Sequence, residues 1–138
     1  MNVVPMDSKG WLWFNSYLPV LAVEDSCGMV AVDSYGQKVA GCVFDNWTNT
    51  SVQAHLLILN PFVIRSGFFV CIAEYVFVER RKNMIYSLVP GNNEKAIRVN
   101  KKLGYSEKCR FEGAFQDGVD YVIMELKKEN CKYLREAA

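Results

Sequence analysis

The side chains best suited to acid–base chemistry are one histidine and a few carboxylates. His55 is the sole histidine of the sequence, and histidine is the side-chain type whose unperturbed pKa lies near neutrality. It could therefore take a proton from a nucleophile. Glu74 is a second candidate catalytic residue, and Glu74, Asp45 and Glu112 could each act as a rival base or could instead bind the ammonium group of an acceptor. A hydrogen-bonded histidine within a sheet is the alternative interpretation of His55.

A second candidate site is the segment 60–68, with the sequence NPFVIRSGF. Pro61 is expected to end a strand, Ser66 to cap the following helix, and Gly67 to let a ligand approach the first-turn backbone. Free N–H groups at a helix start attract anions, and the Arg65 guanidinium would add positive charge. The segment therefore predicts a phosphate site, with an ordinary capped loop as the alternative.

The sequence offers little for metal chemistry or disulfides. It has five cysteines, an odd number, without a C-x-x-C pair, at positions 27, 42, 71, 109 and 131. One histidine is too few for the usual clustered metal sites. We therefore expect no metal, and buried, reduced thiols in a cytoplasmic protein.

The elements that must position these residues follow from hydrophobic periodicity and turn signals. The expected helices cover 8–20, with Ser8 near its cap, 66–80, and 93–103, capped by Asn92 or Asn93 and stopped by Gly104. Hairpins are expected at 29–33 with 38–44 and at 109–115 with 119–126, and further strands at 52–59 and 84–89. The apolar second half of 52–59 predicts a central strand covered on both faces. This order predicts a partly parallel mixed sheet with helices on its faces.

The length and the net charge of the chain limit the number of domains and the classes of partner. The 138 residues fit a single domain over 1–138, and the formal net charge is +1. Nucleic-acid and anionic-membrane binders normally carry a basic excess, so neither partner is expected. The longest uncharged run, 46–64, contains too many polar residues to span a membrane.

One stretch resembles a known family. Residues 89–105 read VPGNNEKAIRVNKKLGY, which is similar to the N-x-x-A-x-x-x-x-x-K-L-G-[FY] pattern of the GNAT N-acetyltransferases. The segments RFEGAF at 110–115 and DGVDY at 117–121 resemble the last hairpin of these enzymes, and 44–55 is similar to small members from bacteriophages and bacteria. The resemblance covers roughly residues 27–134.

The resemblance implies a mixed α/β fold: a central, mostly antiparallel, twisted sheet of about six to seven strands, flanked by helices, with a splayed pair of parallel strands. It also implies binding of acetyl-CoA. The pantetheine amides would pair with the main chain of Leu57, Ile58 and Leu59, and the pantetheine arm would also accept a hydrogen bond from or donate one to Asn93. The pyrophosphate would face Arg65, Ser66, Gly67 and Phe68. The candidates for binding the 3′-phosphate would be Lys95, Arg98 and Lys102.

The implied activity is direct transfer of an acetyl group from acetyl-CoA to a primary amine, which could be a protein N-terminus, a lysine or a small amine. Three positions depart from the family pattern: Ile64 stands where the family has Gln or Arg, Phe69 replaces a small residue, and Asn100 replaces a frequent Tyr. These departures favour the alternative of a weak or inactive CoA-binding or protein-interaction module. A homodimer is a further open expectation.

Overall fold

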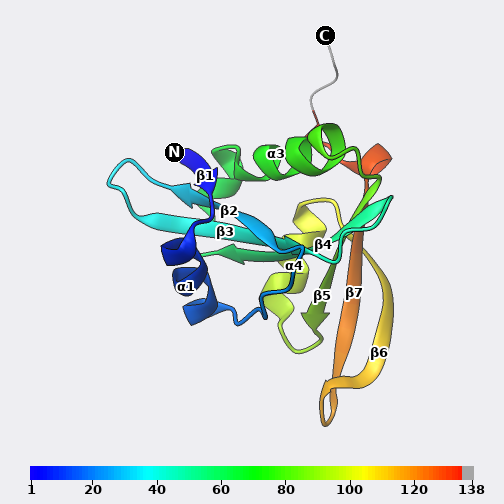
Figure 1. Ribbon diagram of the computed structural model, residues 1–138. Helices are drawn as coiled ribbons and strands as arrows, with labels where there is room; N and C mark the ends of the chain where they lie inside the picture. The colour runs from blue at the N-terminus through cyan, green and yellow to red at the C-terminus, as the bar shows by residue number, and fades with distance from the viewer. Residues whose placement is uncertain (135–138) are drawn as a thin grey trace.

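The computed structural model describes residues 1–134, which form a seven-stranded sheet with helices on both faces (Figure 1). The sheet order is β1-β2-β3-β4-β5-β7-β6; β4 and β5 run parallel, and the other neighbours are antiparallel. The strands are β1 (Asn2–Pro5), β2 (Cys27–Val32), β3 (Lys38–Asp45), β4 (Ser51–Ile58), β5 (Met84–Pro90), β6 (Ser106–Gln116) and β7 (Val119–Lys127). The helices are α1 (Ser8–Tyr17), α2 (Phe62–Arg65), α3 (Phe68–Ala73), η1 (Glu74–Glu79), α4 (Glu94–Lys102) and η2 (Lys128–Asn130).

The predicted mixed sheet, both hairpins and the helix over 93–103 are confirmed. Asn93 caps α4, since its side-chain oxygen accepts from the N–H of Ala96 at 3.1 Å. β1, a four-residue edge strand that pairs with β2, was not predicted. Its two adjacent valines were too short a signal to indicate a strand.

Two predicted helix starts are corrected. Asp7, one residue before Ser8, caps α1 by accepting from the N–H of Gly10 at 2.8 Å, and α1 ends at Tyr17 rather than near Val20. Ser66 does not cap the next helix, because its hydroxyl donates back to the carbonyl of Phe62, the first residue of α2. Gly67 takes the cap position with φ 94°, a conformation that glycine adopts without steric cost. The helix predicted over 66–80 thus begins at Phe68, after the left-handed residue Gly67, and runs through α3 into the π-helical η1. The short helix α2 before it was not predicted.

The two faces of the sheet carry different helices. α1 packs on β2 and β3, and a Cβ on Gly41 would lie within 3.1 Å of the rings of Phe14 and Trp13. We call this side the α1 face. α3 and its continuation η1 pack on the other side, where the ring centroids of Phe44 on β3 and Tyr75 on η1 lie 5.3 Å apart. The buried Ile97 of α4 belongs to the same hydrophobic core. This is the α3 face, and Figure 1 shows α1 and α3 on opposite sides of the sheet.

The parallel strands separate after a short pairing, so the expected splayed pair is confirmed. β4 pairs with β5 through Ser51–Gln53 and Met84–Tyr86. Just beyond this pairing, the buried Ser87 hydroxyl of β5 donates to the Ala54 carbonyl of β4 at 2.9 Å. This bond holds the two strands together where they begin to separate. The second half of β4 is consequently half-buried, and the expectation that it is covered on both faces is wrong.

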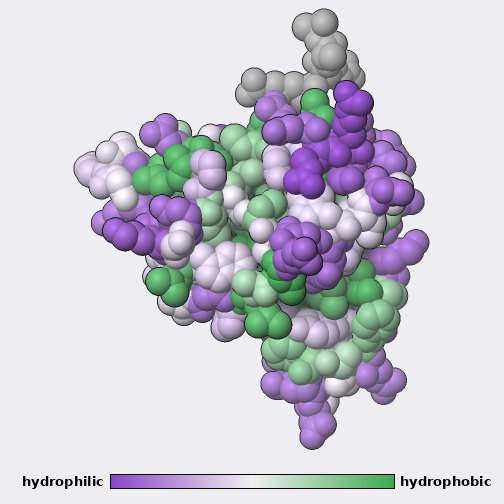
Figure 2. All heavy atoms as spheres, in the orientation of Figure 1, coloured by the Kyte–Doolittle hydropathy of each residue, from purple (hydrophilic) through white to green (hydrophobic). Residues whose placement is uncertain are grey.

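The outer edge of the sheet is exposed. Every residue of β6 is exposed, including Phe111 and Phe115, and Figure 2 shows apolar side chains around β6 and β7. Cys109 lies on this strand and is exposed, so the expectation of five buried thiols is wrong; Cys42 and Cys131 are the buried pair. No helix in the described part of the chain is long and apolar enough to cross a membrane.

Candidate active site

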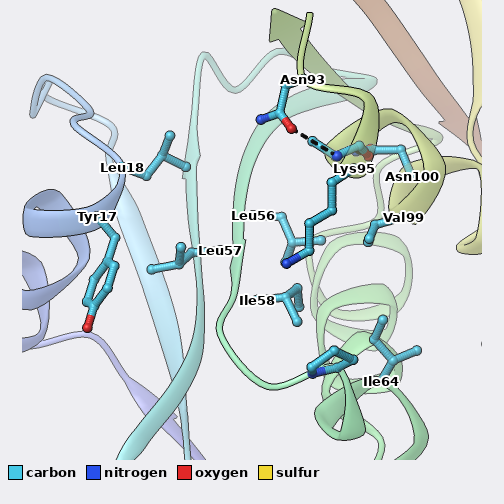
Figure 3. Close-up of a pocket in the computed structure, with 12 residues that line it drawn as sticks. Tyr17, Leu18, Leu56, Leu57, Ile58, Ile64, Asn93, Lys95, Val99 and Asn100 are labelled. Atoms are coloured by element: carbon cyan, nitrogen blue, oxygen red, sulfur yellow. Dashed lines mark hydrogen bonds between the residues drawn. The ribbon is translucent and has the colours of Figure 1, made fainter.

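A cleft of about 270 Å³ lies where β4 has separated from β5 (Figure 3). It is bounded by the free edge of β4, the end of α1, the turn that begins α2, and one side of α4. The residues that line it are Tyr17, Leu18, Leu56, Leu57, Ile58, Pro61, Ile64, Asn93, Lys95, Ala96, Val99 and Asn100. The cleft is therefore mostly apolar, with a few polar groups supplied by α4.

The main chain of β4 offers hydrogen-bonding groups to this cleft. The N–H of Leu59 donates to the Val39 carbonyl on β3, and antiparallel pairing alternates, so Leu57 also bonds toward β3. The N–H and C=O groups of Leu56 and Ile58 point the other way, toward the cleft. Of the predicted pantetheine partners, Ile58 thus presents its backbone, Leu57 contributes its side chain, and Leu59 lies beyond the strand.

Leu56 was missed by sequence reasoning. Its main chain faces the cleft because of the register between β3 and β4, in which Leu56 opposes Cys42. A run of apolar residues does not reveal which alternate residues bond to the neighbouring strand, so the sequence carried no signal for it.

The helix start at Gly67 is open and follows α2, whose residue Ile64 lines the cleft. A Cβ placed on Gly67 would meet no atom within 4 Å. Phe69 does not crowd this space, since its buried ring packs against Tyr105 and Tyr133 at centroid distances of 6.1 and 5.2 Å. Arg65 and Ser66 are exposed next to it. The first-turn N–H groups of α3 lack intrahelical acceptors, so the segment can receive an anion despite the missing Ser66 cap.

The cations of α4 divide into two groups. Lys95 lines the cleft, and Figure 3 shows its ammonium group extending along the cleft toward Ile58. Arg98 and Lys102 are exposed and do not line it. Phe68, predicted to face the pyrophosphate, does not line it either, because its side chain is buried in the core. The structure thus brings Lys95 to the cleft and leaves the other two candidates on the outer surface of the helix.

Asn100 lies at the wall of the cleft. Its amide donates to the Ala96 carbonyl at 2.8 Å, and the residue is 7% exposed. An amide held in this way has no proton to give at neutral pH. Any proton transfer must therefore come from elsewhere.

A second and larger pocket, of about 620 Å³, opens on the α1 face and shares Leu18 with the cleft. It contains His55, whose Nε2 lies 2.9 Å from Asp45 Oδ2. The side chains are 22% and 8% exposed, respectively. Because an ionised carboxylate only accepts, Nε2 carries the hydrogen of this bond, and in the neutral form of the ring Nδ1 holds the lone pair. This arrangement can orient a histidine base.

Asp45 has unused bonding capacity. Its Oδ1 is buried without a hydrogen-bond partner among the described residues. Burial, followed by the negative charges of Asp45 and Asp25, raises the pKa of the nearby Tyr86 hydroxyl. The carboxylate of Asp25 is exposed and accepts from the N–H groups of Asn46 and Trp47, whereas Oδ1 of the buried Asp45 has no such partner.

The structure does not bring Glu74 to His55. Glu74 begins η1 on the α3 face, and His55 lies on the α1 face, as does its neighbour across the sheet, Val43. Glu112 is exposed on β6. Within residues 1–134, no group of three or more His, Cys, Asp and Glu side chains is placed to hold a metal ion.

The likeness to known proteins lies in the fold. No family model and no curated protein matches the sequence. Among solved structures, spermidine/spermine N-acetyltransferase SpeG from Vibrio cholerae superimposes with a TM-score of 0.77 at 11% identity, covering 93% of this chain and 92% of that one. A GNAT-family protein from Desulfovibrio desulfuricans gives 0.63 at 13% identity, over 75% and 69%. This chain has the GNAT acetyltransferase fold. The Vibrio cholerae spermidine N-acetyltransferase crystallised with CoA and spermine gives 0.68 at 13% identity, over 88% and 76%.

Proposed function

We propose that this protein binds acetyl-CoA in the cleft beside β4 and transfers the acetyl group to a primary amine in the His55 pocket. The observation that carries the proposal is the separation of β4 from β5. It leaves the backbone groups of Leu56 and Ile58 free at the edge of a cleft that also contains Lys95 and adjoins the pocket of His55.

The residues present fit the cosubstrate. Strand-like hydrogen bonds from Leu56 and Ile58 suit the amides of a pantetheine arm, and the NH₂ group of Asn93 is a further donor because its oxygen caps α4. The open backbone at Gly67 and the ammonium of Lys95 suit phosphate groups. The neighbour crystallised with CoA supports the same assignment.

The chemistry requires one base and no covalent enzyme intermediate. Acetyl-CoA supplies an activated thioester, so that attack by a neutral amine forms the C–N bond, breaks the C–S bond and releases CoA. His55 takes the proton that the amine must lose, using Nδ1, while Asp45 holds the ring and stabilises its positive charge. The net reaction converts an ammonium ion and acetyl-CoA into an amide, CoA thiol and one proton, which His55 passes to solvent.

A second candidate function is CoA binding without turnover. It is favoured by Asn100, whose amide is held by Ala96 and cannot protonate a leaving thiolate. Ile64, in place of Gln or Arg at the cleft wall, also removes a polar phosphate contact.

One experiment separates the two. Acetyl-CoA is titrated by calorimetry, and release of CoA thiol is then followed with a panel of primary amines. We expect binding, with about 2.7 kcal/mol of added stability at 100 times Kd, and release of thiol with at least one amine. Binding without release would favour the second candidate, and absence of binding would exclude both.

A further inference from the structure

We propose that this protein prefers acyl donors with a chain longer than acetyl, and that the apolar part of the His55 pocket receives this chain. The inference rests on the proposed function and deepens it by naming a class of donor. Acetyl is then the shortest group that the site transfers, and the preferred donor is the CoA thioester of an unbranched medium-chain acid.

The first support is the direction in which the donor lies in the cleft. Its phosphate groups belong at the open backbone of Gly67, which follows Ile58 and α2 along the chain. The pantetheine arm then runs along the edge of β4 from Ile58 toward Leu56, and the next residue in that direction is His55. The thioester end is thus directed toward the His55 pocket, which shares Leu18 with the cleft.

The strand register places apolar side chains of the pocket next to the cleft. β4 and β5 pair at Gln53 and Tyr86, so Leu88 lies about level with His55 as the strands separate. Pro90 lies two residues farther along β5, where the chain turns toward α4 and the cleft. An acyl chain that leaves the thioester therefore meets apolar side chains first.

The apolar wall continues away from the cleft across the sheet. Tyr121 on β7 pairs with Pro90, and the Phe115 ring centroid lies 5.3 Å from that of Tyr121. Leu21 and Phe115 are 84% and 42% exposed, and an exposed apolar surface of this kind is typical of a binding groove. The apolar and aromatic residues of the pocket are Leu18, Pro19, Val20, Leu21, Val23, Leu88, Pro90, Phe115 and Tyr121.

The polar part of the pocket leaves room for the amine. The amide of Asn46 donates to that of Gln53 at 2.7 Å, and Gln53 precedes His55 on β4, on the side away from the cleft. His55 thus lies between the apolar wall and a polar end from which an amine can approach. The volume is about 620 Å³, and pockets of about 300 to 1,000 Å³ hold whole small-molecule ligands. The methyl of an acetyl group would cover only a small part of this wall.

A longer chain changes no bond of the reaction. Attack by the amine forms the C–N bond and breaks the C–S bond of the thioester, so that the products are an amide and CoA thiol, and one proton leaves through His55. The chain contributes to binding, because each CH₂ group removed from water improves affinity about fourfold.

The test is calorimetric titration with acetyl-CoA, butanoyl-CoA, hexanoyl-CoA and octanoyl-CoA. Because the pocket is partly open, we expect incomplete burial and a Kd for octanoyl-CoA that is about tenfold or more below that for acetyl-CoA. Equal Kd values, or tighter binding of acetyl-CoA, would overturn the inference, assign the apolar wall to the acceptor and leave the proposed function intact. Absence of binding by every thioester would overturn both.

Phe115→Ala tests where the chain lies. Loss of this ring should reduce the preference for octanoyl-CoA over acetyl-CoA, measured as the ratio of their Kd values, by about threefold or more. Phe111→Ala is the matched control, because Phe111 is on the same strand, is 50% exposed and lines neither the pocket nor the cleft. Equal ratios in the two variants would overturn the placement of the chain along this wall.

Leu88→Phe adds bulk near the start of the chain instead of removing it near the end. Leu88 is half-buried and lines the pocket, so a larger ring can extend into it. We expect this variant to lose about tenfold or more of the preference for octanoyl-CoA, and an unchanged preference would overturn the inference. If octanoyl-CoA binds more tightly in a manner that depends on Leu88 and Phe115, but no amine releases CoA thiol, the chain pocket is supported and the proposed turnover fails.

Discussion

At the scale of single residues, the pairing of His55 with Asp45 is the feature that most directly supports chemistry. The sequence indicated His55, because no other side chain of its type is present, and named Asp45 only as a rival. The pair forms because Asp45 lies opposite Gln53 in the β3–β4 register, which places it diagonally across from His55. Residue types can be read from a sequence, but such a register depends on tertiary packing.

Replacing His55 tests its role as the base. His55→Gln keeps a hydrogen-bonding side chain and removes the ring nitrogen that accepts the proton, so kcat/KM should fall by about 10²–10⁴-fold. Acetyl-CoA affinity should stay the same, because the ring lies in the second pocket and does not line the cleft. Steady-state kinetics over a range of pH are the measurement, and the acid limb of the profile should disappear. Full activity in the variant would assign His55 to structure alone.

Lys95 is expected to differ from the other cations of α4. Its ammonium group lies in the cleft, so Lys95→Ala should weaken acetyl-CoA binding roughly twofold to fivefold, as loss of an exposed ion pair does. The remaining affinity should also depend less on salt. Lys101→Ala, on the same helix but outside the cleft, is the control, and equal effects of the two changes would contradict this assignment.

At the scale of elements, local patterns predicted the helices and hairpins well where turn signals were strong. Asn93 and Gly104 bracket α4, and Asp117-Gly118 closes the β6–β7 hairpin. The segment 66–80 was harder to predict, because its apolar residues favour both strand and helix. The short helix α2 before it was missed, and Gly67 separates that helix from α3. Ser66 was a plausible cap from its type, but its hydroxyl bonds backward to Phe62.

The anion site at the start of α3 can be tested with charge at Gly67. Gly67→Asp would place a carboxylate where phosphate is expected, and like charges at about 4 Å cost about 1 to 4 kcal/mol over plausible dielectrics. Gly67→Asn is the matched control, since both side chains tolerate positive φ and differ in charge. We expect calorimetry to show a rise in the Kd for acetyl-CoA of about fivefold or more for Asp relative to Asn. Equal Kd values would place the phosphates elsewhere.

The point where β4 and β5 separate can be tested at Ser87. The change Ser87→Ala removes the donor to the buried Ala54 carbonyl, and an unpaired buried acceptor costs about 1 to 3 kcal/mol. Urea unfolding should show this loss, and acetyl-CoA affinity should fall because the edge of β4 is less firmly held. Ser106→Ala, at an exposed position of β6, should change neither quantity. A variant of Ser87 with unaltered stability would show that the bond does not hold the strands.

At the scale of the whole molecule, the site is created by contacts between distant segments. The cleft needs β4 to leave β5, and its walls come from α1, β4, the turn before α2, and α4. The resemblance of residues 89–105 to a known pattern predicted this arrangement, whereas periodicity alone predicted a mixed sheet. The pocket around His55 was not predicted, because its walls combine the segment after α1 with the β6–β7 hairpin.

Tyr105, the last residue of the pattern at 89–105, contributes to how the stability of the whole fold depends on pH. It is 5% exposed, and its ring lies against that of Phe69 with the centroids 6.1 Å apart. Burial raises the pKa of the Tyr105 hydroxyl far above the ordinary tyrosine value of about 10.

This shift makes the folded state sensitive to alkali. Between about pH 10 and the higher folded pKa, Tyr105 is ionised in the unfolded chain and protonated in the folded one, so unfolding releases a proton and stability falls as pH rises. The contribution approaches 1.4 kcal/mol per pH unit. Tyr105→Phe should flatten the decline of the free energy of unfolding above pH 10, because the buried hydroxyl is gone. Urea unfolding at several pH values measures this decline, with Tyr35→Phe, at an 88% exposed position, as the control. Burial also raises the pKa values of Tyr86 and Cys42, so some decline should remain, and a slope identical to that of the unaltered protein would contradict the role of Tyr105.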